Sequence, residues 1–152
     1  MLETSQIANF FDPFLSEPKQ YIDLHIHTKA SDGLIDLNFL RKFLKNTSHL
    51  ISITDHNEIK SNLELYNNSK INIVPGIEVG CKDGFELLIY FKTDTELIDF
   101  YNKNVKPFKN KYKIARTKQT HDYYLKQAEK YNCFISIPHI YGLAQKNYLN
   151  NK

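Results

Sequence analysis

Histidine and carboxylate side chains recur beside short apolar runs along the chain. His25 and His27 are two residues apart in the run 21–27 (YIDLHIH), so on a strand both imidazoles project from the same face. Two neutral imidazoles side by side form half of a metal site. Asp32 follows in a Ser-Asp-Gly turn, where Gly33 lets the chain reverse and brings the carboxylate back towards the end of the strand.

The same arrangement returns in later runs. Three further apolar runs carry ionisable residues: 50–54 (LISIT) leads into Asp55 and His56, 71–79 (INIVPGIEV) holds Glu78, and 133–138 (CFISIP) leads into His139. In parallel α/β folds the carboxyl ends of the strands meet at one edge, where ligands bind, so we expect these side chains to converge. A mixed nitrogen and oxygen set of this size suits two or more zinc, manganese or iron ions better than magnesium or calcium.

Short strands and helices must position these side chains. The strand candidates are residues 21–27, 50–54, 71–79, 85–91 and 133–138. Apolar residues at helical spacing follow Asp36, which can cap a helix, and recur at 59–66, 97–101 and 108–131. The alternation of strands with helices predicts parallel pairing and the α/β class. Pro75 and Gly76 indicate a bend or a sheet edge, and His121 in the longest helix is interpreted as a core histidine.

Four of these runs resemble the motifs of a known family. DLHIHTKASDG is similar to the first motif of the PHP (polymerase and histidinol phosphatase) family, ITDHN to the second, PGIEV to the third and ISIPH to a later one, in the family's order over about residues 20–142. The resemblance implies an α/β fold that is a partial or shortened form of the family's distorted (β/α)7 TIM-like barrel. It also implies metal ligands at His25, His27, Asp32, His56, Glu78 and His139. Asp55 and Asn57 would act in catalysis by orienting the groups beside them.

The chain also departs from the family pattern at two places. Many members carry a further ligand histidine in the strand after the third motif, and here Glu86 in the run FELLIYF occupies that place, so we expect a carboxylate ligand there. The family's late Asp-x-His motif has no counterpart, because no His, Asp or Glu follows His139.

Two functions follow from the resemblance. The first is a metal-dependent phosphoesterase, in which a metal-activated hydroxide attacks a phosphomonoester or phosphodiester. The missing late motif leaves open a non-catalytic metal-binding module, a partner subunit or a truncated fragment of a longer protein. An unpaired sheet edge would favour self-association or a partner chain. The expected organisation is an N-terminal arm at 1–20, the metal-binding domain at 21–142 and a tail at 143–152.

Length and composition predict one globular domain. The chain has 152 residues, of which 41% are hydrophobic and 24% charged. The net charge of +3 could help to hold an anionic substrate but is too small to indicate nucleic acid by itself. Cys81 and Cys133 are expected to be free thiols, and Cys81 to be a small buried residue. No signal peptide or membrane segment is recognisable, so a cytoplasmic location is the default expectation.

A basic stretch could contact the substrate. Residues 103–118 contain seven lysines and arginines and no acidic residue, with Phe108 and Tyr112 among them. This composition fits a phosphate or nucleic-acid track, and it also fits a solvated helix entrance. Lys29 and Arg116 are the cations predicted to contact a substrate phosphate. The expected partner is a phosphorylated small molecule or nucleotide, and nucleic acid stays open as an alternative.

Overall fold

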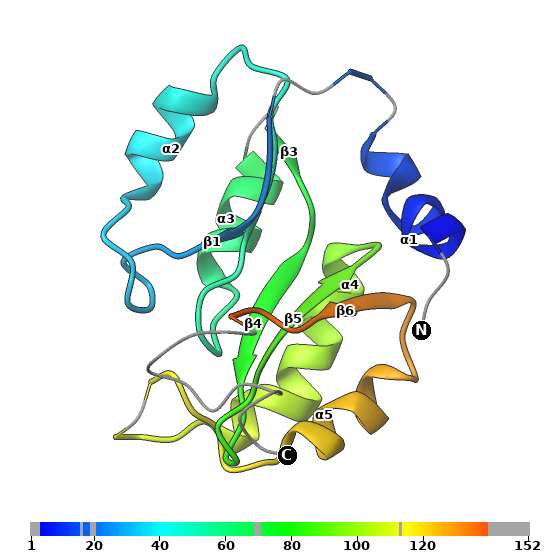
Figure 1. Cartoon of the computed structure of the whole chain (residues 1–152). Coiled ribbons are helices and arrows are strands. Elements are labelled where there is room, and N and C mark those ends of the chain that lie inside the picture. Colours follow the sequence, from blue (N-terminus) through cyan, green and yellow to red (C-terminus); the bar gives the residue numbers. More distant parts are fainter. Residues whose placement is uncertain (1–3, 16, 19–20, 69–70, 113, 140–152) are drawn as a thin grey trace.

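The computed structural model describes residues 4–15, 17–18, 21–68, 71–112 and 114–139 (Figure 1). The predicted tail at 143–152 lies outside the described residues. Among those described, no helix is both long and apolar enough to cross a lipid bilayer.

The first half of the chain forms a parallel sheet. Its strand order is β1 (Ile22–Ile26), β2 (Leu50–Ile53) and β3 (Asn72–Ile73), and the connecting helices are α2 (Leu37–Leu44) and α3 (Lys60–Asn68). Asp36 caps α2 as predicted, because its Oδ1 accepts a hydrogen bond from the Asn38 N–H at 2.8 Å. Leu40, Leu44 and Leu65 pack from these helices onto the sheet. This half confirms the α/β class with parallel pairing.

The second half forms an antiparallel sheet, so the expectation of parallel pairing throughout is wrong. Its order is β4 (Gly76–Gly80), β5 (Glu86–Phe91) and β6 (Cys133–Ser136). The connection 81–85 is too short to hold a crossover helix, and Gly84 turns it with a φ of 95°. α4 (Asp94–Phe100) then leads away from the end of β5 and α5 (His121–Ala128) leads back, so β6 begins opposite Phe91 and runs antiparallel to β5.

A bent segment joins the two sheets. Val74 and Pro75 separate β3 from β4, and β4 begins at Gly76, so the chain passes from one sheet to the other where the bend or sheet edge was expected. Before the bend, the Val74 N–H donates to the Ile51 carbonyl at 2.9 Å; after it, Glu78 bridges in parallel to His56 beyond the end of β2. The described strands do not close into a barrel, so the fold is a partial α/β arrangement.

The helix predicted over 108–131 is wrong in extent. A π-helical turn, η2 (Tyr101–Val105), and a 3-10 turn, η3 (Lys106–Phe108), precede this region or overlap its first residue. The described residues that follow form turns and bends around the Lys109–Thr117 bridge, and only the short α5 is helical. Pro107 fits only the first turn of a helix, and Thr120 caps α5 by accepting from the Tyr123 N–H. His121 consequently lies in the first turn of α5, its side chain 30% exposed and paired with Asp83, and is not a core histidine.

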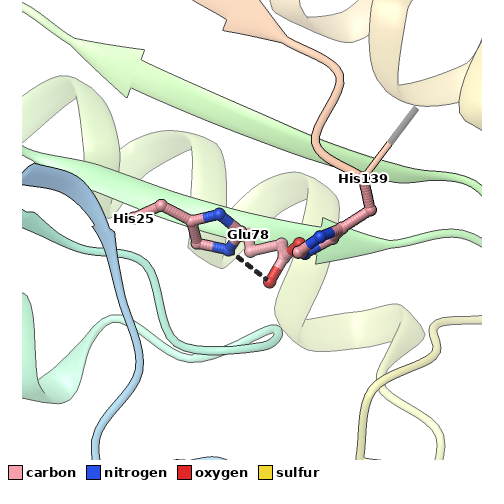
Figure 2. Close-up of side chains that lie close together, drawn as sticks. All are labelled: His25, Glu78 and His139. Carbon is pink, nitrogen blue, oxygen red and sulfur yellow. Dashed lines mark hydrogen bonds and ion pairs between the residues drawn. The ribbon is translucent and has the colours of Figure 1, made fainter. Parts of the chain in front are cut away.

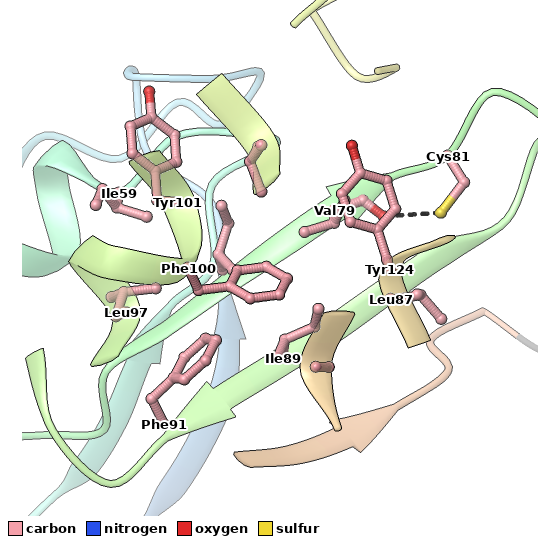
Figure 3. Close-up of a cluster of buried hydrophobic side chains, with 13 residues drawn as sticks. Ile59, Val79, Cys81, Leu87, Ile89, Phe91, Leu97, Phe100, Tyr101 and Tyr124 are labelled. Carbon is pink, nitrogen blue, oxygen red and sulfur yellow. Dashed lines mark hydrogen bonds between the residues drawn. The ribbon is translucent and has the colours of Figure 1, made fainter. Parts of the chain in front are cut away.

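The largest core cluster lies between the antiparallel sheet and the later helices (Figure 3). Val79, Leu87 and Ile89 of the sheet pack with Phe100 and Tyr124 of the helices. Cys81 is completely buried, as predicted, and both cysteines are free.

The N-terminal segment contributes to a separate core cluster. It forms α1 (Thr4–Phe11) and the 3-10 turn η1 (Asp12–Phe14). Phe10 and Phe11 of α1 pack with Leu50, Tyr90 and Phe134, which belong to both sheets. Each buried aromatic ring is worth roughly 2–3 kcal/mol of transfer free energy, so part of the segment predicted as an arm stabilises the fold.

Candidate metal centre

The strands deliver the predicted side chains to one edge of the fold. β1, β2, β4 and β6 run in the same sense, which places His27, His56 and His139 just beyond the ends of three of them and Glu78 within the fourth. β5 runs in the opposite sense, so its first residue, Glu86, lies at this same edge. The topology therefore brings together groups that are separated by more than 100 positions in the sequence.

Glu78 is the centre of the cluster. Its side chain is completely buried, and its Oε2 has three imidazole nitrogens around it. His27 Nε2 lies 2.7 Å away, His25 Nε2 lies 3.3 Å away and His56 Nδ1 lies 3.3 Å away. The Nε2 atoms of His25 and His27 are only 3.0 Å apart. Several lone-pair donors therefore face one small volume.

Asp32 extends this cluster at its exposed side. Its Oδ1 lies 2.7 Å from His27 Nδ1, and its Oδ2 lies 3.5 Å from His56 Nε2. Gly33 makes the approach possible, because a Cβ at that position would overlap the carbonyl oxygen of His27. His27, Asp32 and His56 each place a donor atom within 4.8 Å of the other two.

His139 completes a second group with His25 and Glu78 (Figure 2). It follows β6 in a left-handed backbone conformation with a φ of 56°, which few non-glycine residues adopt. The ring centroids of His25 and His139 are 5.1 Å apart. Donor atoms of the three residues lie within 4.8 Å of one another, so His139 belongs to the cluster.

His56, Glu78 and Glu86 form a third group, and all three are buried. Each has one buried donor atom without a hydrogen-bond partner: His56 Nδ1, Glu78 Oε1 and Glu86 Oε2. A buried acceptor without a partner costs about 1–3 kcal/mol. A cation bound among the three residues would give each of these atoms a partner.

The donor set fits a divalent transition metal. Bonds of about 2.0–2.2 Å to nitrogen and oxygen place neighbouring ligand atoms roughly 2.8–3.6 Å apart, from octahedral to tetrahedral geometry. The separations around Glu78 run from 2.7 to 3.3 Å, close to this range. Imidazole and carboxylate together suit zinc, manganese or iron. The seven predicted ligands all fall within the three groups, which overlap at Glu78 and His56.

Hydrogen bonds and charges control the ionisation of this cluster. The hydrogen bond with Glu78 raises the pKa of His27 from 6.5 to about 9, against the effect of burial and with help from Asp32. Burial alone would raise the pKa of Glu78, but the hydrogen bonds with His25 and His27 and the charge of His56 lower it to about 2. Burial alone would also raise the pKa of Asp32, but the hydrogen bond with His27 and the charge of His56 lower it below its usual value. In the metal-free protein, a protonated imidazole thus balances a buried carboxylate.

Asp55 and Asn57 lie behind the cluster and hold its loops. Asp55 Oδ1 accepts from the Thr28 N–H and from the Ser31 hydroxyl, both at 2.7 Å, and its Oδ2 accepts from the Thr28 hydroxyl at 2.7 Å. Asn57 adopts a left-handed φ of 53°, and its Oδ1 accepts from the Gly80 N–H at 3.1 Å. Neither residue belongs to the three donor groups.

The sequence alone did not single out Thr28 and Ser31. Both hydroxyls bind Asp55, and the Thr28 hydroxyl lies 2.8 Å from that of Ser61. Their positions inside HIHT and SDG, directly beside the predicted ligands, were the available signal. Groups that hydrogen-bond behind a metal site commonly orient its ligands, and these two hydroxyls fix the turn that carries Asp32.

The two predicted substrate-binding cations lie in different places. Lys29 is not brought to the cluster: its ammonium is 3.9 Å from Asp36, and it lines a cavity of about 330 Å³ with Arg41 and Lys60. Arg116 reaches the cluster, because its Nη1 donates to Glu86 Oε1 at 2.5 Å.

Fold and site together define an α/β protein with histidine and carboxylate groups that could bind metal ions. No family model and no curated protein matches the chain. Among solved structures, it resembles the lesion-specific endonuclease PfuEndoQ from Pyrococcus furiosus, with a TM-score of 0.60 and 20% identity. The match covers 78% of this chain and 34% of that structure, so the chain spans about a third of its length. At this identity, the likeness shows a shared fold.

Proposed function

We propose that the chain is a PHP-type, metal-dependent phosphoesterase. The observation that carries this proposal is the third donor group: donor atoms of the buried residues His56, Glu78 and Glu86 lie within 4.8 Å of one another, and each residue has a buried donor atom without a hydrogen bond. The order of the four motifs and the fold shared with an endonuclease support it.

The residues of the three groups would hold two or more divalent ions. His27, Asp32 and His56 would hold one, and His25, Glu78 and His139 another, with Glu86 joining His56 and Glu78. A bound transition metal supplies Lewis acidity, which activates water and neutralises charge on phosphoryl oxygens. The exposed carboxylate of Asp32 marks the side from which a substrate would enter.

Asp55 and Asn57 are proposed to act by positioning. Asp55 fixes the 28–31 turn through three hydrogen bonds and so sets the approach of Asp32 to His27. Asn57 ties the end of β2 to Gly80 and, through its Nδ2, to the Ile114 carbonyl at 2.8 Å. Arg116 would contact a substrate phosphate directly. Lys29 would contact a more distant part of the substrate.

Turnover of phosphoesters tests the proposal. Metal-free protein is loaded with manganese or zinc, its metal content is measured, and a panel of phosphomonoesters and phosphodiesters is assayed. We expect hydrolysis that disappears with a chelator and in the His27→Ala variant, but not in the control variant His121→Ala, whose histidine lies outside the three groups. Metal-loaded, folded protein without turnover on any substrate would contradict catalysis.

A non-catalytic metal-binding module or partner subunit is the second candidate. It is favoured by the two open sheets that the described strands form. This alternative predicts metal binding without hydrolysis, and hydrolysis only when a partner chain is added.

A further inference from the structure

A basic ribbon lies beside the metal centre. We use this name for the described residues 106–112 and 114–118. Its two arms are side by side, because Lys109 and Thr117 form an antiparallel bridge and the Lys118 N–H donates to the Phe108 carbonyl at 2.9 Å. The cations that the sequence spreads over a dozen positions are thereby gathered in one small element.

The ribbon is fixed to the loops of the metal centre. The Gly80 carbonyl accepts from the Thr117 N–H at 2.7 Å and from its hydroxyl at 2.9 Å, and the Ile114 carbonyl accepts from Asn57. A side chain at Gly80 would overlap the Ala115 carbonyl, so the close approach requires glycine there. The ribbon is therefore held in one position relative to the cluster.

Several charges on the ribbon are uncompensated. Lys109 pairs with Glu58 at 2.9 Å and Arg116 with Glu86. Lys106, Lys111 and Lys118 are exposed and have no ion pair within the described part of the chain. Because no acidic residue occurs between positions 103 and 118, the ribbon carries a local positive field that attracts polyanions.

The ribbon also exposes flat apolar surface. Tyr112 is 87% exposed and Ile114 is 64% exposed, so neither stabilises the core. The Lys111 ammonium lies 5.8 Å from the centroid of the Tyr112 ring. An exposed aromatic ring beside cations is the combination on which unpaired bases stack while lysines neutralise the backbone.

We propose that the basic ribbon binds single-stranded nucleic acid and leads its backbone to the metal centre. Arg116 forms the inner end of this path. Only its Nη1 makes hydrogen bonds among the described residues, so its other N–H groups can receive a phosphate oxygen. Tyr112 forms the outer end, where it stacks on a base. This inference rests on the proposed phosphoesterase function and names its substrate class.

Binding of a hydrolysis-resistant phosphorothioate oligothymidylate to the manganese-loaded protein tests this proposal by fluorescence anisotropy. We expect Tyr112→Ala to weaken binding by about tenfold, which corresponds to the usual loss of one stacked base. Lys111→Gln should weaken binding and should reduce the slope of the logarithm of the affinity against the logarithm of the salt concentration by about one. Tyr21→Ala and Lys42→Gln, two exposed residues away from the ribbon, are the matched controls and should bind like the unchanged protein.

Arg116 needs two variants, because losing it would leave Glu86 buried without its partner. Arg116→Lys keeps the charge, and the double variant Glu86→Gln with Arg116→Met removes both charges. We expect both to weaken binding. Thermal unfolding checks folding, and metal analysis checks that the double variant, which also changes the proposed ligand Glu86, is still loaded with manganese.

Three outcomes would overturn the inference: unchanged affinity in Tyr112→Ala and Lys111→Gln, equal affinity for a duplex, or displacement of the oligonucleotide by polyglutamate as readily as by unlabelled oligonucleotide. Hydrolysis of small phosphoesters without oligonucleotide binding would contradict the nucleic-acid site but agree with the proposed phosphoesterase function. Oligonucleotide binding that depends on Tyr112, without any turnover, would contradict the phosphoesterase function but agree with the nucleic-acid site.

Discussion

Glu78 is the residue that connects the three donor groups of the centre. Its buried carboxylate touches three imidazoles, and one of its oxygens has no partner. We predict that Glu78→Gln lowers metal affinity by more than about 100-fold, beyond the 10–100-fold typical of residues that only orient ligands. Glu129→Gln, which removes an exposed carboxylate, is the matched control. Equal metal content in both variants would show that Glu78 is not a ligand.

His27 gives the metal-free protein a distinctive pH dependence. Its pKa is raised from 6.5 to about 9 by Glu78, so its contribution to stability is complete below pH 6.5 and is lost as the pH rises through about 9. The metal-loaded protein needs a neutral imidazole and should keep its stability over this range. Thermal unfolding from pH 6.5 to 9.5 with a chelator and with manganese measures both. A parallel decline in the two forms would contradict the assignment of His27 as a ligand.

The turn that follows β1 places Asp32 against His27, and Gly33 permits it. We predict that Gly33→Ala costs about 1–3 kcal/mol, the usual cost of overpacking, because its Cβ meets the His27 carbonyl. Metal binding should weaken with it, since Asp32 moves away. Chemical denaturation and metal titration measure the two effects. Leu34→Ala is the control, because Leu34 is 90% exposed in the same turn; if both variants behave alike, the turn does not position Asp32.

Apolar runs in the sequence located the strands well but did not determine their direction. β1, β2 and β6 lie within the predicted runs, because apolar residues that alternate with polar ones indicate a strand. The direction of β5 depends on the five-residue connection 81–85, whose Asp83-Gly84 pair is a hairpin signal that strand–helix alternation obscured.

The candidate ligands were predictable because they stand in or beside such a run or, for Asp32, in a Ser-Asp-Gly turn after one, whereas their partners were not predictable. Arg116 falls in a lysine-rich stretch whose apolar spacing imitates a helix. Its contact with Glu86 depends on the ribbon that forms after Pro107. The hydroxyl contacts of Asp55 likewise depend on the fold of a turn, which spacing alone does not specify.

The molecule as a whole should be stabilised by the metal. A ligand present at 100 times its dissociation constant adds about 2.7 kcal/mol, which for a chain of this size raises the Tm by about 5–10 °C. Differential scanning calorimetry with manganese or zinc, followed by a chelator, measures the gain and its reversal. Identical Tm values in all three conditions would contradict a native metal site.

The bend at Pro75 and Gly76 has a consequence for motion. His27, Asp32 and His56 follow strands of the parallel sheet, whereas Glu86 and His139 belong to the antiparallel sheet, and Glu78 contacts both sets. An ion gripped by both sets would restrain rotation of one sheet against the other about that bend. Metal binding and the rigidity of the two sheets would then be gained and lost together. Amide hydrogen exchange near the bend would therefore slow when the metal centre is occupied, although the residues of the bend are not ligands.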